Sequence, residues 1–192
     1  MVNILICCTG SVATIKIPEI RSNLSQLDNC RVKLIVTEHS RHFLPELCQL
    51  GTPGEDVLCD EDEWRSWRGR GDPVLHIELR NWADIAVIAP LSANSLAKLA
   101  NGLADNLLTC VMRAWDLEKP ALVAPAMNTQ MWEHPVTSQQ LTILRGWGYS
   151  VIPPCSKTLG ERKSNSQAEI QFLNQLVQKL AGTSVCLKPA AE

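Results

Sequence analysis

The stretch Val2–Ser11 (VNILICCTGS) decides the fold expected for this chain. An apolar run of strand length, Val2–Cys8, ends at the turn Thr9-Gly10-Ser11, and a helical pattern follows over Ala13–Leu27. A buried strand that turns through a glycine into a helix is the usual start of a β-α-β unit. We therefore predict a parallel sheet whose first strand lies at the start of the chain.

Strand and helix patterns alternate along the rest of the sequence. Further strands are predicted at Arg31–Thr37, Ala83–Pro90, Pro120–Ala124 and Tyr149–Ile152, with Pro90 ending the third strand. Helices are predicted at His39–Leu47, Asp60–Arg68, Ser92–Ala100, Asp105–Trp115, Pro135–Trp147 and Asn165–Leu180. This spacing predicts an α/β fold, a three-layer doubly wound parallel sheet of Rossmann or flavodoxin type with right-handed crossovers. One domain is expected over residues 1–180, followed by a C-terminal tail at 181–192.

Composition bounds the class of protein. The chain has 192 residues, 45% of them hydrophobic, and a net charge of -2, which is typical of a soluble globular domain. The charge is too small to indicate nucleic acid or a membrane surface as a partner. No apolar run approaches the length of a membrane span, and the N-terminus lacks the features of a secretory signal. A cytoplasmic protein is expected.

The chain contains eight cysteines but no Cys-x-x-Cys pair. Without a secretion signal, reduced thiols are expected rather than disulfides. Cys7, Cys8 and Cys110 lie in apolar stretches, where cysteine commonly packs as a small hydrophobic residue. No structural metal is expected.

Polar side chains follow three predicted strands. Gly10 lies at the first strand-to-helix turn, where a backbone can approach a phosphate, but an ordinary turn glycine explains it equally well. Thr37 and Ser40 follow the second strand and either cap a helix or hold a phosphate or flavin edge. Pro90–Ser95 (PLSANS) follows the third strand. Neither a Gly-x-Gly-x-x-Gly fingerprint nor a Walker loop is present, so the three ends together suggest a different phosphorylated ligand.

A fourth loop, Pro125–Trp132 (PAMNTQMW), follows the apolar run Ala121–Ala124 and leads into a helix. Ligands of open α/β sheets bind outside the carboxyl ends of the strands. Asn128 offers an amide donor and a carbonyl acceptor there, beside two methionines that form apolar walls. Trp132 either walls the same pocket or attaches the loop to the core. The loop is a candidate small-molecule site.

His76 is the candidate general base. It alternates with apolar neighbours, so it is expected to face away from Leu75 and Ile77. A lone histidine is more often structural or merely exposed, but its titration near neutral pH suits proton transfer. The other three histidines, His39, His42 and His134, are rival candidates.

Taken together, these motifs are similar to those of a known family. It resembles the homo-oligomeric flavin-containing cysteine decarboxylases, and within them the enzymes of coenzyme A synthesis. The resemblance covers about four fifths of the chain, in order. It is carried by Thr9–Ala13 (TGSVA), Asp72–Ile77 (DPVLHI), Trp82–Asp84 (WAD), Ala89–Leu96 (APLSANSL), Asp105–Cys110 (DNLLTC), Arg113–Asp116 (RAWD) and Pro125–Trp132.

The resemblance implies an FMN-dependent decarboxylation of phosphopantothenoylcysteine. It implies that His76 is the catalytic base, and that Asn128 binds the substrate carboxylate with Met131 and Lys157 also in the substrate site. The implied cofactor residues are Gly10, Ser11, Val12, Thr37 and Ser40, with Ser92, Ala93, Asn94 and Ser95 around the phosphate and Ala126 against the ring system. Family members are typically trimers, in which one protomer supplies His76 and its neighbour supplies Asn128.

The sequence departs from the family after Pro153-Pro154. The coenzyme A enzymes carry a substrate-clamping loop there, whose cysteine donates the proton needed when an ene-thiol intermediate is reduced to the final product. Residues 155–169 (CSKTLGERKSNSQAE) lack a cysteine at that place, although Cys155 lies upstream and Cys186 lies in the tail. Three functions therefore remain: a working decarboxylase, an oxidative decarboxylase that stops at the ene-thiol, and a non-enzymatic regulatory or assembly subunit.

Overall fold

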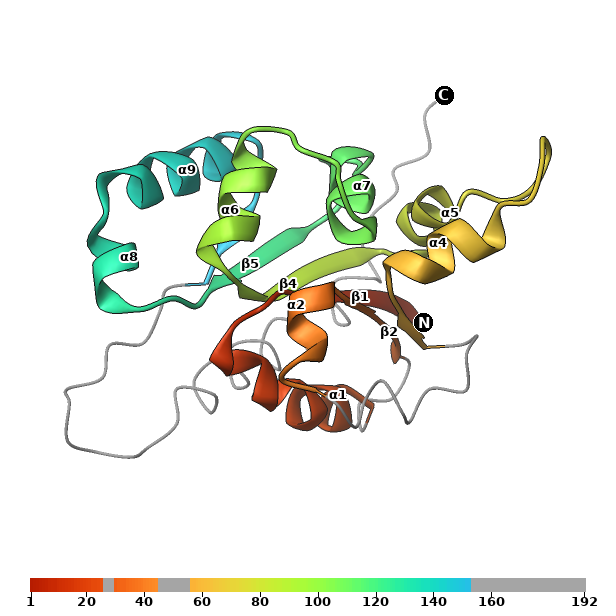
Figure 1. Ribbon diagram of the computed structural model, residues 1–192, viewed down its shortest axis with the longest axis horizontal. Coiled ribbons are helices and arrows are strands. Elements are labelled where there is room, and N and C mark those ends of the chain that lie inside the picture. The colour runs from red at the N-terminus through yellow and green to blue at the C-terminus, as the bar shows by residue number, and fades with distance from the viewer. Residues whose placement is uncertain (26–29, 45–55, 153–192) are drawn as a thin grey trace, which may run out of the picture.

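A computed structural model describes residues 1–25, 30–44 and 56–152. Its centre is a parallel six-stranded sheet (Figure 1). The strands are β1 (Val2–Cys8), β2 (Cys30–Val36), β3 (Val57–Leu58), β4 (Ile85–Leu91), β5 (Ala121–Pro125) and β6 (Ser150–Val151). They lie in the order β3-β2-β1-β4-β5-β6, which is the doubly wound Rossmann order. The chain adds strands to one side of β1 as far as β3 and then to the other side from β4 onward, so the strand order reverses between β1 and β4 and a ligand crevice is expected at their carboxyl ends.

Helices cover both faces of the sheet. They are η1 (Val12–Lys16, a 3-10 helix), α1 (Ile17–Ser25), α2 (Glu38–Arg41), α4 (Asp60–Ser66), α5 (Leu75–Trp82), α6 (Ala93–Ala100), α7 (Leu107–Arg113), α8 (Thr129–Glu133) and α9 (Pro135–Gly146). Figure 1 shows α1 below the sheet and α6, α7 and α9 above it. The predicted three-layer α/β architecture is therefore confirmed.

The alternation of side chains along the strands builds the two cores. Leu5 and Cys7 point to the face covered by α5, α6, α7 and α9, while Ile4, Ile6 and Cys8 point to the face covered by α1. These five side chains are fully buried. The prediction that Cys7 and Cys8 pack as small hydrophobic residues is confirmed.

Several predicted boundaries are wrong. The strand predicted to stop at Pro90 continues to Leu91, with a register shift between Ile88 and Leu91 that accommodates a residue lacking an N–H. The helix predicted over Ala13–Leu27 begins as the 3-10 turn η1. Two elements were missed altogether, the two-residue β3 and the helix α5.

Some expectations fall outside the described residues. The last helix at 165–180, the domain boundary at 180, the tail and Lys157 all lie there. Among the described residues, no helix combines the length and the apolar character needed to cross a membrane.

Candidate functional site

The carboxyl ends of β1 and β4 are fastened together by Thr9. Its hydroxyl donates to the Pro90 carbonyl at 2.7 Å and accepts the Ser92 N–H at 2.8 Å. Its own carbonyl accepts the hydroxyl of Thr14 from η1 at 2.8 Å. Thr9 is 1% exposed, so these bonds are shielded from water. This one side chain fixes the two strand ends that flank the point where the strand order reverses.

Gly10 permits a close approach between two strand-end loops. A Cβ built on Gly10 would lie 2.6 Å from the Cβ of His39, which is too close for any other residue. The Thr37 N–H donates to the Cys8 carbonyl at 3.1 Å and holds the same two loops together. The ends of β1 and β2 are therefore adjacent, as predicted, and Gly10 has a packing role in addition to any ligand role.

The fourth loop reaches the same place. The Ser11 hydroxyl donates to the Ala126 carbonyl at 3.3 Å, and the Ala126 N–H donates to the Leu91 carbonyl at 2.9 Å. Val12 is 69% exposed beside them, so its side chain is open to contact with a ligand. Residues from the ends of β1, β2, β4 and β5 thus meet at one edge of the sheet, where the fold predicts a ligand crevice.

Polar groups suited to an anion line the start of α6. Ser92 is the N-cap, and its hydroxyl accepts the Ser95 N–H at 3.2 Å. The N–H groups of Ala93 and Asn94, in the first turn, have no carbonyl partner within the helix and are available to a phosphate.

The end of β2 adds a buried hydroxyl without a partner. Thr37 is 6% exposed, and its hydroxyl makes no hydrogen bond within the described part of the chain. Ser40 is fully buried and donates its hydroxyl to the Thr37 carbonyl at 2.7 Å, so its donor is already used. A buried hydroxyl needs a partner, and FMN, with its phosphate, ribityl hydroxyls and flat ring, fits this donor set.

The oxygen and the NH₂ group of the Asn128 amide differ in their hydrogen bonding. It is the N-cap of α8, and its Oδ1 accepts the Met131 N–H at 2.9 Å. The amide NH₂ has no hydrogen-bond partner among the described residues, and the residue is exposed. A carboxylate needs donors, so the free half of the amide is the half that suits it. Trp132 packs against the core and attaches this loop to the sheet.

His76 lies in the first turn of α5, where a strand-like alternation was expected. Leu75 packs against the core and Ile77 is exposed, so the two do not share a face and that expectation is wrong. The His76 Nδ1 is hydrogen-bonded to Oε1 of Glu63 on α4. Both side chains are partly buried, with 25% of His76 and 14% of Glu63 exposed.

Cys110, on α7, completes a cluster with this pair. Ligand atoms of Glu63, His76 and Cys110 lie within 4.8 Å of one another, a set that could geometrically hold a metal ion. Cys110 is only half-buried, so the expectation that it packs as a core residue is wrong. Burial, followed by the charges of Glu63, Asp105 and Asp60, raises the pKa of the Cys110 thiol. Both effects favour the protonated thiol.

The remaining histidines are engaged elsewhere. His39 adjoins Gly10, and the ring of His42 meets Phe43 edge-on. His134 is the N-cap of α9, where its Nδ1 accepts the Val136 N–H at 3.2 Å. Only His76 has a carboxylate partner among the histidines of the described segments.

One chain does not bring the predicted base and the predicted carboxylate-binding residue together. Figure 1 shows α5, which carries His76, and α8, which Asn128 caps, at opposite ends of the longest axis of the molecule.

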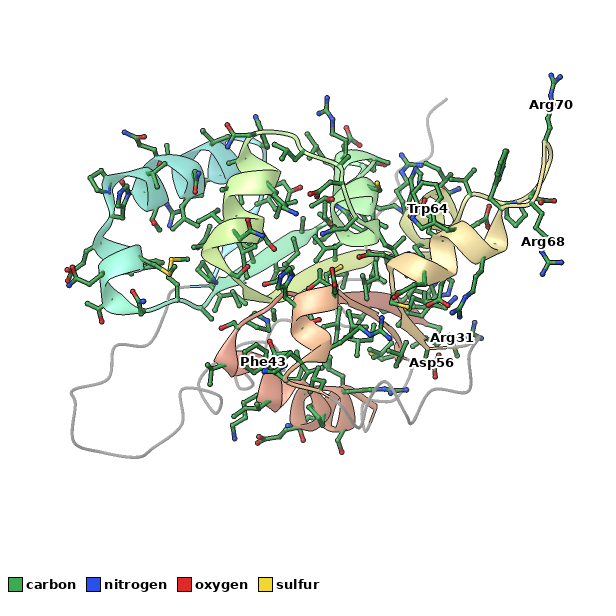
Figure 2. The ribbon with its side chains drawn as sticks, viewed as in Figure 1. Arg31, Phe43, Asp56, Trp64, Arg68 and Arg70 are labelled. Carbon is green, nitrogen blue, oxygen red and sulfur yellow. The ribbon has the colours of Figure 1, made fainter. Side chains whose placement is uncertain are left out.

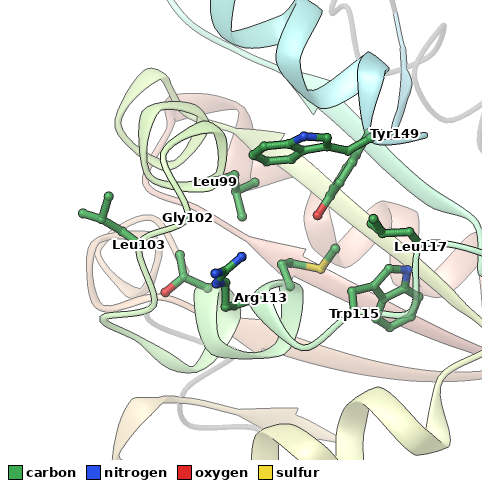
Figure 3. Close-up of a pocket in the computed structure, with 10 residues that line it drawn as sticks. Leu99, Gly102, Leu103, Arg113, Trp115, Leu117 and Tyr149 are labelled. Atoms are coloured by element: carbon green, nitrogen blue, oxygen red, sulfur yellow. The ribbon is translucent and has the colours of Figure 1, made fainter.

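A cavity of about 330 Å³ lies away from this crevice (Figure 3). It is lined by residues that include Gly102, Arg113, Leu117 and Trp147, which follow helices or precede strands. That position is the amino-terminal edge of the sheet, opposite the edge where ligands of doubly wound folds bind. We do not place the cofactor there.

Sequence reasoning missed Thr9 and Glu63. Thr9 adjoins the predicted Gly10 turn, so a buried hydroxyl after a strand was a usable signal. Glu63 stands 13 residues before His76 on a separate helix, and no sequence pattern pairs the two.

Comparisons with known proteins agree with the geometry. Residues 1–184 match the family model described as Flavoprotein. The chain is 46% identical over 181 residues to phosphopantothenoylcysteine decarboxylase of Mus musculus, covering 91% of this chain and 85% of that protein. A cysteine-to-serine mutant of PPC decarboxylase complexed with pantothenoylaminoethenethiol superposes with a TM-score of 0.80 at 43% identity, covering 92% of this chain and 98% of that chain. The FMN-binding protein AtHal3 superposes with a TM-score of 0.81 at 43% identity, covering 92% of this chain and 97% of that chain.

Proposed function

Because this chain belongs to the flavoprotein family, we propose that it catalyses the FMN-dependent decarboxylation of phosphopantothenoylcysteine, a carboxy-lyase step of coenzyme A biosynthesis. The observation that carries the proposal is the crevice itself. Ser11, Thr37, Ser92 and Ala126 come from four strand ends and meet where the fold binds ligands, in a chain 46% identical to a named decarboxylase.

The proposed roles follow from the free groups in the crevice. The N–H groups of Ala93 and Asn94 hold the cofactor phosphate, and the Thr37 hydroxyl bonds a polar edge of the cofactor. FMN supplies the oxidation of the substrate thiol to a thioaldehyde, which can accept the electrons released with carbon dioxide. The Asn128 amide holds the departing carboxylate, and His76 accepts a proton from the substrate.

We propose that the active protein is a homotrimer with each site at a subunit interface. Two ends of the molecule that lie far apart each carry half of the required groups. Both ends also expose apolar side chains that a neighbour would cover, Trp64 at 80% on α4 and Met131 at 50% beside Asn128. Figure 2 shows Trp64 at the same end of the molecule as α5. A cytoplasmic location is supported by the free state of the cysteines within the described ranges.

A second candidate function is oxidative decarboxylation that stops at the ene-thiol. The observation that favours it is the absence of a cysteine between residues 156 and 169. The solved mutant of a related decarboxylase, with one cysteine changed to serine, is complexed with pantothenoylaminoethenethiol, an ene-thiol.

Mass spectrometry of the products formed from phosphopantothenoylcysteine separates the candidates. Phosphopantetheine supports the complete reaction, and a product two hydrogens lighter supports the truncated one. No product, from a yellow protein with bound flavin, would point to the non-enzymatic subunit. His76→Asn should abolish carbon dioxide release while flavin remains bound, and unchanged turnover would reject His76 as the base.

A further inference from the structure

Glu63 and His76 form a hydrogen-bonded pair at the junction of three helices. Glu63 lies on α4, His76 on α5, and α7 packs beside them with Cys110. An ionised carboxylate can only accept hydrogen bonds, so the bond to Glu63 requires a proton on Nδ1 whenever the His76 ring is in its neutral form. The other ring nitrogen, Nε2, is then the unprotonated one.

Hydrogen bonds fix the two helices that carry the pair. The Asp60 carboxylate accepts the Leu107 N–H at the start of α7 at 2.8 Å, which joins α4 to α7. The Asp62 carboxylate accepts the Cys59 N–H at 2.8 Å and closes the first turn of α4. On the other side, the Arg80 Nε donates to the Ala114 carbonyl at 3.0 Å and joins α5 to the end of α7. Both helices that carry the pair are therefore tied to the same third helix.

We propose that Glu63 is a positioning residue that holds His76 in the tautomer with its proton on Nδ1 and presents Nε2 as the proton acceptor. The inference rests on the proposed function of His76 and deepens it. When Nε2 takes a proton from the substrate, the ring becomes an imidazolium that keeps its Nδ1–H bond to Glu63. The same carboxylate thus orients the neutral ring and faces the positive charge that forms.

The test compares Glu63→Gln, Glu63→Asp and the control Glu78→Gln. A Gln amide can donate to Nδ1, which permits the tautomer with the proton on Nε2, whereas Asp can only accept. For Glu63→Gln we expect the kcat for carbon dioxide release to fall at least about 100-fold, with KM within about twofold. Glu63→Asp should recover at least about tenfold of that loss, because the acceptor is restored. Glu78→Gln removes the same charge from the exposed side of α5 and should leave kcat within about twofold of wild type.

The tautomer itself is the readout that a merely structural role would not move. In the flavin-loaded protein labelled with ¹⁵N-histidine, His76 is assigned by its loss in His76→Asn. Wild type and Glu63→Asp should carry the proton on Nδ1, and Glu63→Gln should show it partly or wholly on Nε2. A proton on Nε2 in the wild type would overturn the proposal, as would wild-type turnover in Glu63→Gln. If the wild type itself releases no carbon dioxide, the proposed function fails. The position of the ring proton in the wild type and in Glu63→Gln then still tests the role of Glu63.

Discussion

Thr9→Val tests whether one buried hydroxyl holds the cofactor crevice together. Valine has nearly the shape of threonine, so the change removes two hydrogen bonds and little packing. It removes the bond to the Pro90 carbonyl and leaves the Ser92 N–H without its acceptor. A lost hydrogen bond costs about 1 kcal/mol, and a buried group left unsatisfied costs about 1–3 kcal/mol, so we expect a destabilisation of about 2–4 kcal/mol.

Urea unfolding, followed by circular dichroism at fixed protomer and FMN concentrations, measures this loss. With a slope of about 2 kcal/mol per molar urea, the midpoint should fall by about 1–2 M with the slope unchanged. FMN should bind about tenfold more weakly, because Ser92 no longer starts α6 in the same place. The matched control is Thr142→Val, which removes an exposed hydroxyl bond to the Ser138 carbonyl and should cost less than about 0.5 kcal/mol. Equal midpoints for the two variants would refute the assigned role of Thr9.

Three further changes probe other parts of the site. Gly10→Ala places a Cβ 2.6 Å from that of His39 and should lower the flavin-to-protein absorbance ratio of the purified protein, and a full flavin load would show that the loops can separate. Asn128→Asp keeps the oxygen that caps α8 but replaces the free NH₂ by negative charge, so substrate KM should rise at least about tenfold with thermal stability unchanged. An unaltered KM would exclude the amide as the carboxylate donor. Because the pKa of Cys110 is raised, its alkylation by iodoacetamide, followed by peptide mass spectrometry, should still accelerate above about pH 9, and a plateau below about pH 8.5 would contradict the effect of burial and of nearby acidic groups such as Glu63.

Local patterns predicted most of the sheet because β1, β4 and β5 are buried along nearly their whole length and read as apolar runs. Val2–Cys8 and Ile85–Leu91 are of this kind. β3 has only two residues and exists through its pairing with Leu34 and Ile35, so it leaves no pattern. α5 was missed because its apolar residues alternate near His76. Its helical form depends on contacts with distant segments, such as the bond from Arg80 to Ala114.

The sequence predicted the part of the site that lies at the carboxyl ends of the strands. Hydroxyls and glycines after apolar runs pointed to Gly10, Thr37 and Ser92, because parallel strands place all their carboxyl ends at one edge. The partner of each group was not predictable. Asn128 could be named as a ligand residue, but only the structure shows that its oxygen accepts the Met131 N–H and that its NH₂ has no partner among the described residues.

Because α5 and α8 lie far apart, the proposed chemistry requires a second subunit. Each of the two side chains is oriented by a neighbour in its own chain. His76 is hydrogen-bonded to Glu63, and the Asn128 oxygen accepts the Met131 N–H. The helices α5 and α8 lie at opposite ends of the longest axis of the molecule, so the two groups do not meet within one chain. In the proposed trimer every subunit lends its histidine to one neighbour and its asparagine to the other. At a substrate concentration well below the raised KM of Asn128→Asp, mixing His76→Asn chains with Asn128→Asp chains should therefore give more activity than either variant alone, since a fraction of the interfaces would join two intact halves. Inactivity in every mixture that forms trimers would require both groups to act within one chain.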